Sequence, residues 1–145
     1  MTSTRTRRVM EQLGYAGLLP FYASALWVAL QLDSGRDLAV RVFVIYGVVI
    51  LAFLGGTVWG NAVARPEPVK VGRLVFSNIV ALFAALAGLA GDAGLACLLL
   101  ALGQVGLLVY ERQTGDPAGW YLAFRTRLSL GVLPAHGLFL FGVVG

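Results

Sequence analysis

The chain has 145 residues, of which 59% are apolar and only 12% carry a charge. Ordinary soluble domains have about 25% charged residues, and a small protein must cover a large surface for its volume. The composition therefore excludes a soluble globular enzyme, and it also excludes a disordered chain, which needs few apolar residues and many charges. We expect an integral membrane protein, and the net charge of +4 has to be explained within that class.

Five long stretches of the chain contain no charged residue. A helix needs about 20 apolar residues to cross the roughly 30 Å hydrocarbon core of a bilayer. No alternating strand pattern is present, and a lone sheet of five strands could not close its edges in lipid. We predict an all-α integral membrane protein, a bundle of five transmembrane helices in a single membrane domain over residues 1–145. The predicted spans are 12–32, 42–64, 74–91, 93–110 and 128–145.

The first and the last span each contain a proline, Pro20 and Pro134, and each proline follows a Gly-apolar-Leu tripeptide. A proline inside a helix removes one backbone hydrogen bond and bends the helix. We expect the carbonyls of Ala16 and Leu130 to lose their partners. Two kinks at similar depth could open a cavity, or they could let two helices curve around the others.

The second span carries four small residues spaced four apart, so that they share one stripe of the helix. In lipid, small residues mark the faces on which helices approach closely. The favoured interpretation is packing within the bundle, and the alternative is a homodimer through the Gly56 and Gly60 face. The stripe consists of Ala52, Gly56, Gly60 and Ala64, with Gly55 alongside it.

The third and fourth spans are separated by a single acid, Asp92, between Gly91 and Gly94. One helix over residues 74–110 would be about twice as long as a bilayer requires. We therefore predict a tight hairpin, in which the glycines turn the chain and Asp92 lies at the water surface.

Basic residues are distributed unevenly between the two sides that five spans create. One side carries nine of the eleven Lys and Arg residues, and the other side carries only Arg36 and Arg41. Because basic loops stay in the cytoplasm, we predict that the N-terminus is inside and the C-terminus outside. The nine are Arg5, Arg7, Arg8, Arg65, Lys70, Arg73, Arg112, Arg125 and Arg127.

Few polar side chains lie within the spans; we place those with amide or imidazole groups in the predicted inner half, where Trp59 also lies. Buried polar groups in lipid need partners, so we expect them to face the bundle interior. They could line a pocket for a lipid headgroup or a quinone ring. Alternatively, they could join helices through interhelical hydrogen bonds, which average only about 0.6 kcal/mol. The candidates are Trp59, Asn78, Gln104 and His136.

No arrangement of residues indicates catalysis or a metal centre. The sequence has no paired acids, no Ser-His-Asp set and no phosphate-binding glycine loop. Cys97 and His136 are the only residues of their types, so one chain cannot build a disulfide or a multi-cysteine metal site. The basic excess lies beside anionic lipid headgroups, which explains it without nucleic acid.

Several segments resemble the transmembrane-protein-69-like family, a domain of unknown function numbered 3429. The resemblance covers essentially the whole chain and implies a small five-span protein of bacterial inner membranes, with relatives in mitochondria, but no established reaction. The third span departs from it, because Ser77 is followed by Asn78 where the family often has Pro and Trp. The resemblance rests on residues 13–21, Tyr46, residues 50–60, Tyr110-Glu111-Arg112, Pro117, Trp120, Tyr121 and Arg125.

These observations favour a non-catalytic, multi-pass protein of the bacterial inner membrane. The first functional hypothesis is an accessory or assembly subunit of a larger complex, respiratory or photosynthetic, because catalytic groups are lacking and the loops are short. The alternative is a lipid- or quinone-binding protein. A minimal channel or transporter comes third, since the outer halves of the spans offer little polar lining. The expected partners are the bilayer, other membrane subunits and, through Gly56 and Gly60, a second copy.

Overall fold

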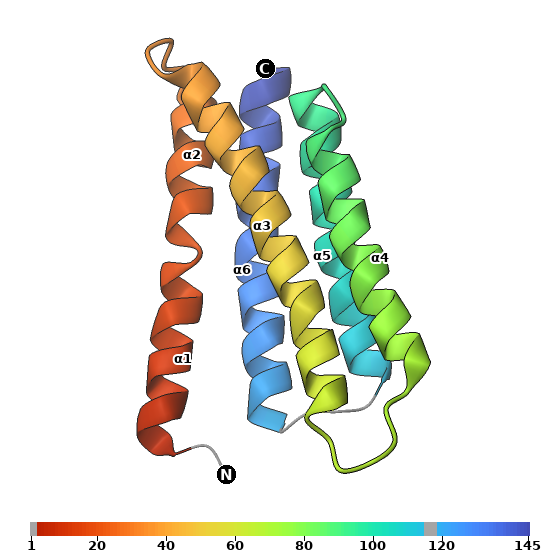
Figure 1. Ribbon diagram of the computed structural model, residues 1–145. Coiled ribbons are helices and arrows are strands. Elements are labelled where there is room, and N and C mark those ends of the chain that lie inside the picture. Colours follow the sequence, from red (N-terminus) through yellow and green to blue (C-terminus); the bar gives the residue numbers. More distant parts are fainter. Residues whose placement is uncertain (1–2, 115–118) are drawn as a thin grey trace.

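The computed structural model describes residues 3–114 and 119–145, and within them every regular element is a helix. Helices α1 and α2 run in the same direction and the direction alternates from α2 to α6, so α1 begins and α6 ends at opposite ends of the bundle (Figure 1). In chain order they are α1 (Thr4–Ala16), α2 (Leu19–Ala29), α3 (Arg36–Val63), α4 (Val71–Gly88), α5 (Ala93–Gln113) and α6 (Gly119–Val144).

Four of these helices, α3 to α6, are long and apolar enough to cross a membrane. The predicted first span is instead divided between α1 and α2, which follow one another along one side of the bundle (Figure 1). The helix breaks at Gly17 and Leu18 because Pro20 lies in the first turn of α2 and has no backbone N–H to continue the ladder.

Near each proline, a tyrosine of a neighbouring helix donates a hydrogen bond to the carbonyl three residues before the proline. The hydroxyl of Tyr46 in α3 donates to the carbonyl of Gly17 over 2.8 Å. The hydroxyl of Tyr22 in α2 donates to the carbonyl of Gly131, three residues before Pro134. The bonded carbonyls therefore lie one residue after the two predicted from the sequence. The outcomes of the two prolines also differ, since α6 continues through Pro134 whereas the chain breaks before Pro20.

The turn between α4 and α5 agrees with the predicted hairpin. Gly91 has a φ of +73°, which a residue with a side chain rarely adopts. The Asp92 carboxylate accepts from the backbone N–H of Leu95 over 2.7 Å and caps α5.

The largest difference from the predicted spans concerns α5 and α6. Helix α5 runs on to Gln113, and α6 already begins at Gly119, nine residues before the predicted span. The charged residues in these extensions, among them Glu111 and Arg125, therefore lie on helices and not in a loop. The charged residues do lie at the ends of the apolar stretches. The helices nevertheless continue past these ends, because Glu111 and Arg125 form an ion pair there.

Helix α3 packs on α4 through Gly55, which lies alongside the predicted stripe, and not through Gly56 and Gly60. A Cβ on Gly55 would lie 2.8 Å from the Val80 side chain of α4, and the Gly55 carbonyl accepts from Ser77 over 2.7 Å. Gly56 and Gly60 are exposed, and a Cβ added at either would have no neighbour within 4 Å among the described residues. The predicted internal seam is wrong for this reason: one residue turns a helix by about 100°, so Gly55 faces α4 while Gly56 faces outward.

The end of the bundle near the C-terminus is closed by a close approach of α2 and α6. At Gly142, a Cβ would lie 2.6 Å from the backbone nitrogen of Ala29. The Gly142 carbonyl accepts from Arg36 over 2.7 Å and from Gln31 over 2.9 Å. These bonds use a carbonyl that the last turn of α6 leaves without a helical partner. This end is therefore fixed by backbone contact and by side chains that cap both helices.

Candidate functional site

The four predicted site residues divide into two groups in the structure. Gln104 on α5 and His136 on α6 are buried, with 2% and 3% of their surface exposed. Trp59 is 44% exposed on α3. Asn78 is exposed on α4, where its amide donates to the Leu74 carbonyl of its own helix. The expectation that all four face the interior is therefore corrected, and the four do not line one cavity.

His136 lies in the apolar core and outside the cavity described below. Its Nδ1 is 3.0 Å from the carbonyl of Val132, one turn earlier in α6. Its ring packs against the rings of Phe21 and Phe43, at centroid distances of 5.4 and 4.9 Å. The buried Nε2 has no hydrogen-bond partner among the described residues. Within those residues, no group of three His, Cys, Asp or Glu side chains could hold a metal ion.

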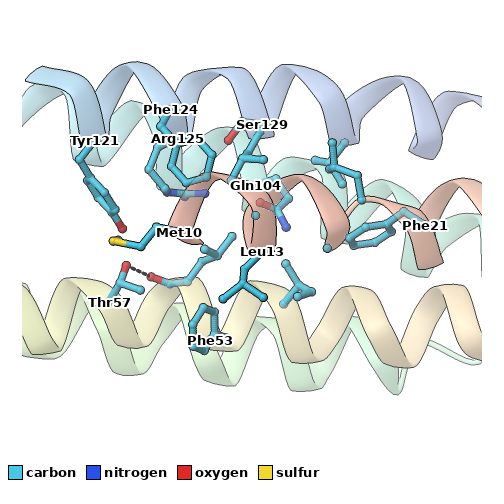
Figure 2. A pocket seen from close by; sticks show the side chains of 17 residues that line it. Met10, Leu13, Phe21, Phe53, Thr57, Gln104, Tyr121, Phe124, Arg125 and Ser129 are labelled. Atoms are coloured by element: carbon cyan, nitrogen blue, oxygen red, sulfur yellow. Dashed lines mark hydrogen bonds between the residues drawn. The ribbon is translucent and has the colours of Figure 1, made fainter. Parts of the chain in front are cut away.

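A cavity of about 340 Å³ lies between α1 and the helices α3, α5 and α6 (Figure 2). Its walls are mostly aliphatic and aromatic, and its polar lining comes from five side chains. This is the form of a small-molecule site, a largely apolar space with a few polar groups. The polar residues are Thr57, Gln104, Tyr121, Arg125 and Ser129.

The position of α1 creates this space. Helix α1 has no buried residue, whereas α2, after the break at Gly17, packs into the core through Phe21 and its neighbours. Only a small residue allows α1 to meet α6, because a Cβ on Gly14 would lie 2.3 Å from the ring of Phe124. The α1 wall of the cavity is therefore a short helix that contacts α6 through Gly14, Tyr15 and Arg7 and buries none of its own residues.

An ion pair between α5 and α6 lies at the cavity. Arg125 Nε and Nη2 lie 3.1 and 2.9 Å from Oε2 of Glu111. Only 3% of the Arg125 side chain and 10% of the Glu111 side chain are exposed. A buried pair of this kind costs much desolvation and contributes little net stability, and ionisable residues inside membrane proteins most often serve function.

Three polar side chains at the cavity retain unused hydrogen-bonding capacity. Within the residues that the structure describes, the Gln104 side chain makes no hydrogen bond and Ser129 Oγ is buried without a partner. Arg125 keeps Nη1 unbonded there, since its bonds to Glu111 use Nε and Nη2. Figure 2 shows the three side chains around the cavity. Buried polar groups are nearly always paired in proteins, so this arrangement indicates a missing partner.

Sequence reasoning identified Gln104 but missed Arg125, Glu111 and Ser129. Arg125 resembles a loop charge in the sequence because its stretch lies before the last charge-free segment. The charge pattern carries a weaker signal, since Glu111 and Arg125 lie at the facing ends of two consecutive antiparallel helices. An acid and a base at the adjoining ends of two such helices can form a pair.

The family comparison agrees with the resemblance read from the sequence. A model of DUF3429, a family of proteins of unknown function, matches residues 6–141, and the chain belongs to this family. The matched region includes every residue that lines the cavity. No curated protein and no solved structure matches the chain. The family carries no known function, and the support for a membrane protein comes from the four long apolar helices.

Proposed function

We propose that this protein binds a small amphiphilic molecule, a lipid or a quinone, in the cavity between α1 and α6, without catalysing a reaction. The observation that carries the proposal is the combination of an apolar cavity of about 340 Å³ with the buried Ser129 hydroxyl and the Gln104 side chain, neither of which has a hydrogen-bond partner among the described residues. Such a combination suits a molecule with an apolar body and a polar head.

The proposal includes five membrane spans in the inner membrane of a bacterium, with the N-terminus in the cytoplasm. The combined length of α1 and α2 and the opposite placement of the termini (Figure 1) support this topology. So does the excess of basic residues, since nine of eleven lie at or near the end where α1 begins. The cavity, lined by α1 and the first half of α6, then belongs to the inner leaflet.

The test is chemical analysis of what leaves the membrane with the protein. The purified chain is extracted with organic solvent, and the extract is compared with total membrane lipid by mass spectrometry. We expect one lipid or quinone class to be enriched. The variant Thr57→Phe fills the cavity from α3 and should lose the enrichment.

A matched control exists on α6. Thr126, like Thr57, bonds a carbonyl of its own helix, but it does not line the cavity. Thr126→Phe should therefore keep the enrichment. If the wild-type extract matches total membrane lipid, or if both variants lose the same molecule, the binding proposal is contradicted.

A second candidate, an accessory subunit of a larger membrane complex, is favoured by the outward face of α3. Gly56 and Gly60 leave open space there, with Phe53 and Trp59 exposed nearby on the same helix. Close helix contact in lipid uses such small residues. Gly56→Leu should leave the melting temperature unchanged and release any partner, or second copy, from the complex isolated in mild detergent. Migration of the wild-type chain as a monomer would contradict this candidate.

A further inference from the structure

The polar wall of the cavity offers hydrogen-bond donors but no net charge. Resting on the ligand binding proposed above, we propose that the ligand has a neutral headgroup with at least two acceptor oxygens. The carbonyls of a quinone ring and the ester carbonyls of a diacylglycerol share this chemistry. A phosphate-bearing lipid is excluded as the preferred ligand, and Arg125, Gln104 and Ser129 are the residues that determine the specificity.

The charge argument rests on Glu111. Among the described residues that line the cavity, Arg125 is the one with a charged side chain. Glu111 neutralises it through two of its nitrogens, at 3.1 and 2.9 Å from the same carboxylate oxygen. A phosphate in the cavity would be a second buried anion near Arg125, because the Glu111 carboxylate is already bonded to this residue. Burying a charge without its own counter-charge is unfavourable, so a neutral head is preferred.

The donor argument rests on groups that the fold leaves unpaired. Nη1 of Arg125, the amide of Gln104 and the hydroxyl of Ser129 can all donate, and none makes a hydrogen bond within the described residues. Arg125 and Ser129 lie one turn apart on α6, and Gln104 approaches from α5 (Figure 2). A head with acceptors on two sides can satisfy donors from both helices.

The volume of the cavity and its opening toward the lipid suit a headgroup, such as a ring or a glycerol ester, that carries an apolar chain. The cavity of about 340 Å³ corresponds to roughly ten water volumes, enough for a head but not for long acyl chains. Two lining residues, Leu13 on α1 and Phe53 on α3, are 68% and 67% exposed on the outer surface. An apolar chain leaving between them reaches the lipid without crossing a charged group.

The experiment compares three probes on the full-length protein in phosphatidylcholine nanodiscs, with native mass spectrometry as the readout. The probes are a benzoquinone with a ten-carbon chain, dioctanoylglycerol and dioctanoyl phosphatidic acid. We expect one of the two neutral probes to bind the wild type and phosphatidic acid to bind at least about tenfold more weakly. The two neutral arms distinguish a quinone from a glyceride. Glu111→Gln leaves the Arg125 charge uncompensated and should raise the affinity for phosphatidic acid.

Serine variants provide the matched control for the donors. Ser129→Ala removes a buried hydroxyl without a partner among the described residues, so the variant should fold. Its affinity for the neutral probe should be about tenfold lower, and Gln104→Leu should lower that affinity to a similar extent. Ser77→Ala removes a buried serine outside the cavity and should leave binding unchanged. Equal binding by all three variants would overturn the assignment of the donors. Preferential binding of phosphatidic acid by the wild type would overturn the neutral headgroup but keep the proposed function, and binding of no probe would overturn the proposed function itself.

Discussion

The approach of Gly142 in α6 to the backbone of α2 gives a sharp prediction about the fold. Gly142→Ala places a Cβ 2.6 Å from the nitrogen and 2.7 Å from the Cα of Ala29. Ordinary carbon contacts lie at about 3.5–4.0 Å, so α6 must move by about 1 Å from α2. The obstacle is backbone, which cannot rotate away as a side chain can. Overpacking of this kind costs about 1–3 kcal/mol. The shift also stretches the bonds from Arg36 and Gln31 to the Gly142 carbonyl.

Thermal unfolding in detergent measures this effect. We expect Gly142→Ala to lower the melting temperature by about 3–9 °C. Gly137→Ala is the matched control on the same helix, where a Cβ has no neighbour within 4 Å among the described residues. That change should leave stability unaltered or raise it slightly, because Ala is favoured over Gly in a helix by up to about 1 kcal/mol. Equal melting temperatures for the two variants would refute the close approach of α2 and α6.

Three further changes test the polar contacts of the bundle by the same unfolding measurement. Arg125→Met leaves the Glu111 carboxylate buried without a partner and should cost about 3–5 kcal/mol, while adding Glu111→Leu should restore most of it; additive losses would contradict a pair. Tyr46→Phe removes the hydroxyl bound to the Gly17 carbonyl and should cost about 1 kcal/mol, with faster amide exchange in α1; unchanged exchange would argue against this anchor. Arg36→Met removes charged bonds to the last carbonyls of α2 and α6 and should cost about 1.5–3 kcal/mol, whereas a wild-type melting temperature would show that these caps are dispensable.

The helical class, the apolar spans and the α4–α5 turn follow from the sequence because they depend on local properties. A bilayer requires long apolar stretches, and charges mark their ends. Around Asp92, glycine and a capping carboxylate define the turn within a few residues. The division at Gly17 is less accessible, because a proline predicts either a bend or a break. The structure has a break before Pro20 and a continuous helix through Pro134, although a tyrosine hydroxyl bonds the corresponding carbonyl at each proline.

The site is only partly predictable because it depends on which side of each helix faces inward. Gln104 and Asn78 look alike in the sequence, as amides within apolar spans. Gln104 is buried against the cavity, whereas Asn78 bonds its own helix on the outside. In a membrane protein both the lipid-facing side and the bundle-facing side of a helix are apolar. The hydrophobic pattern of the sequence therefore says little about which side faces inward. Arg125 requires knowledge of the α5–α6 pairing, which charge counting alone does not provide.

The central claim is that the cavity between α1 and α6 binds a ligand, and a ligand-dependent melting temperature tests it most directly. A molecule that binds only the folded protein stabilises it by about 2.7 kcal/mol at about a hundred times its dissociation constant. The account predicts that the ten-carbon benzoquinone or dioctanoylglycerol raises the melting temperature of the wild type and of Thr126→Phe, but not that of Thr57→Phe. No rise for the wild type with either probe, or an equal rise for Thr57→Phe, would contradict the claim.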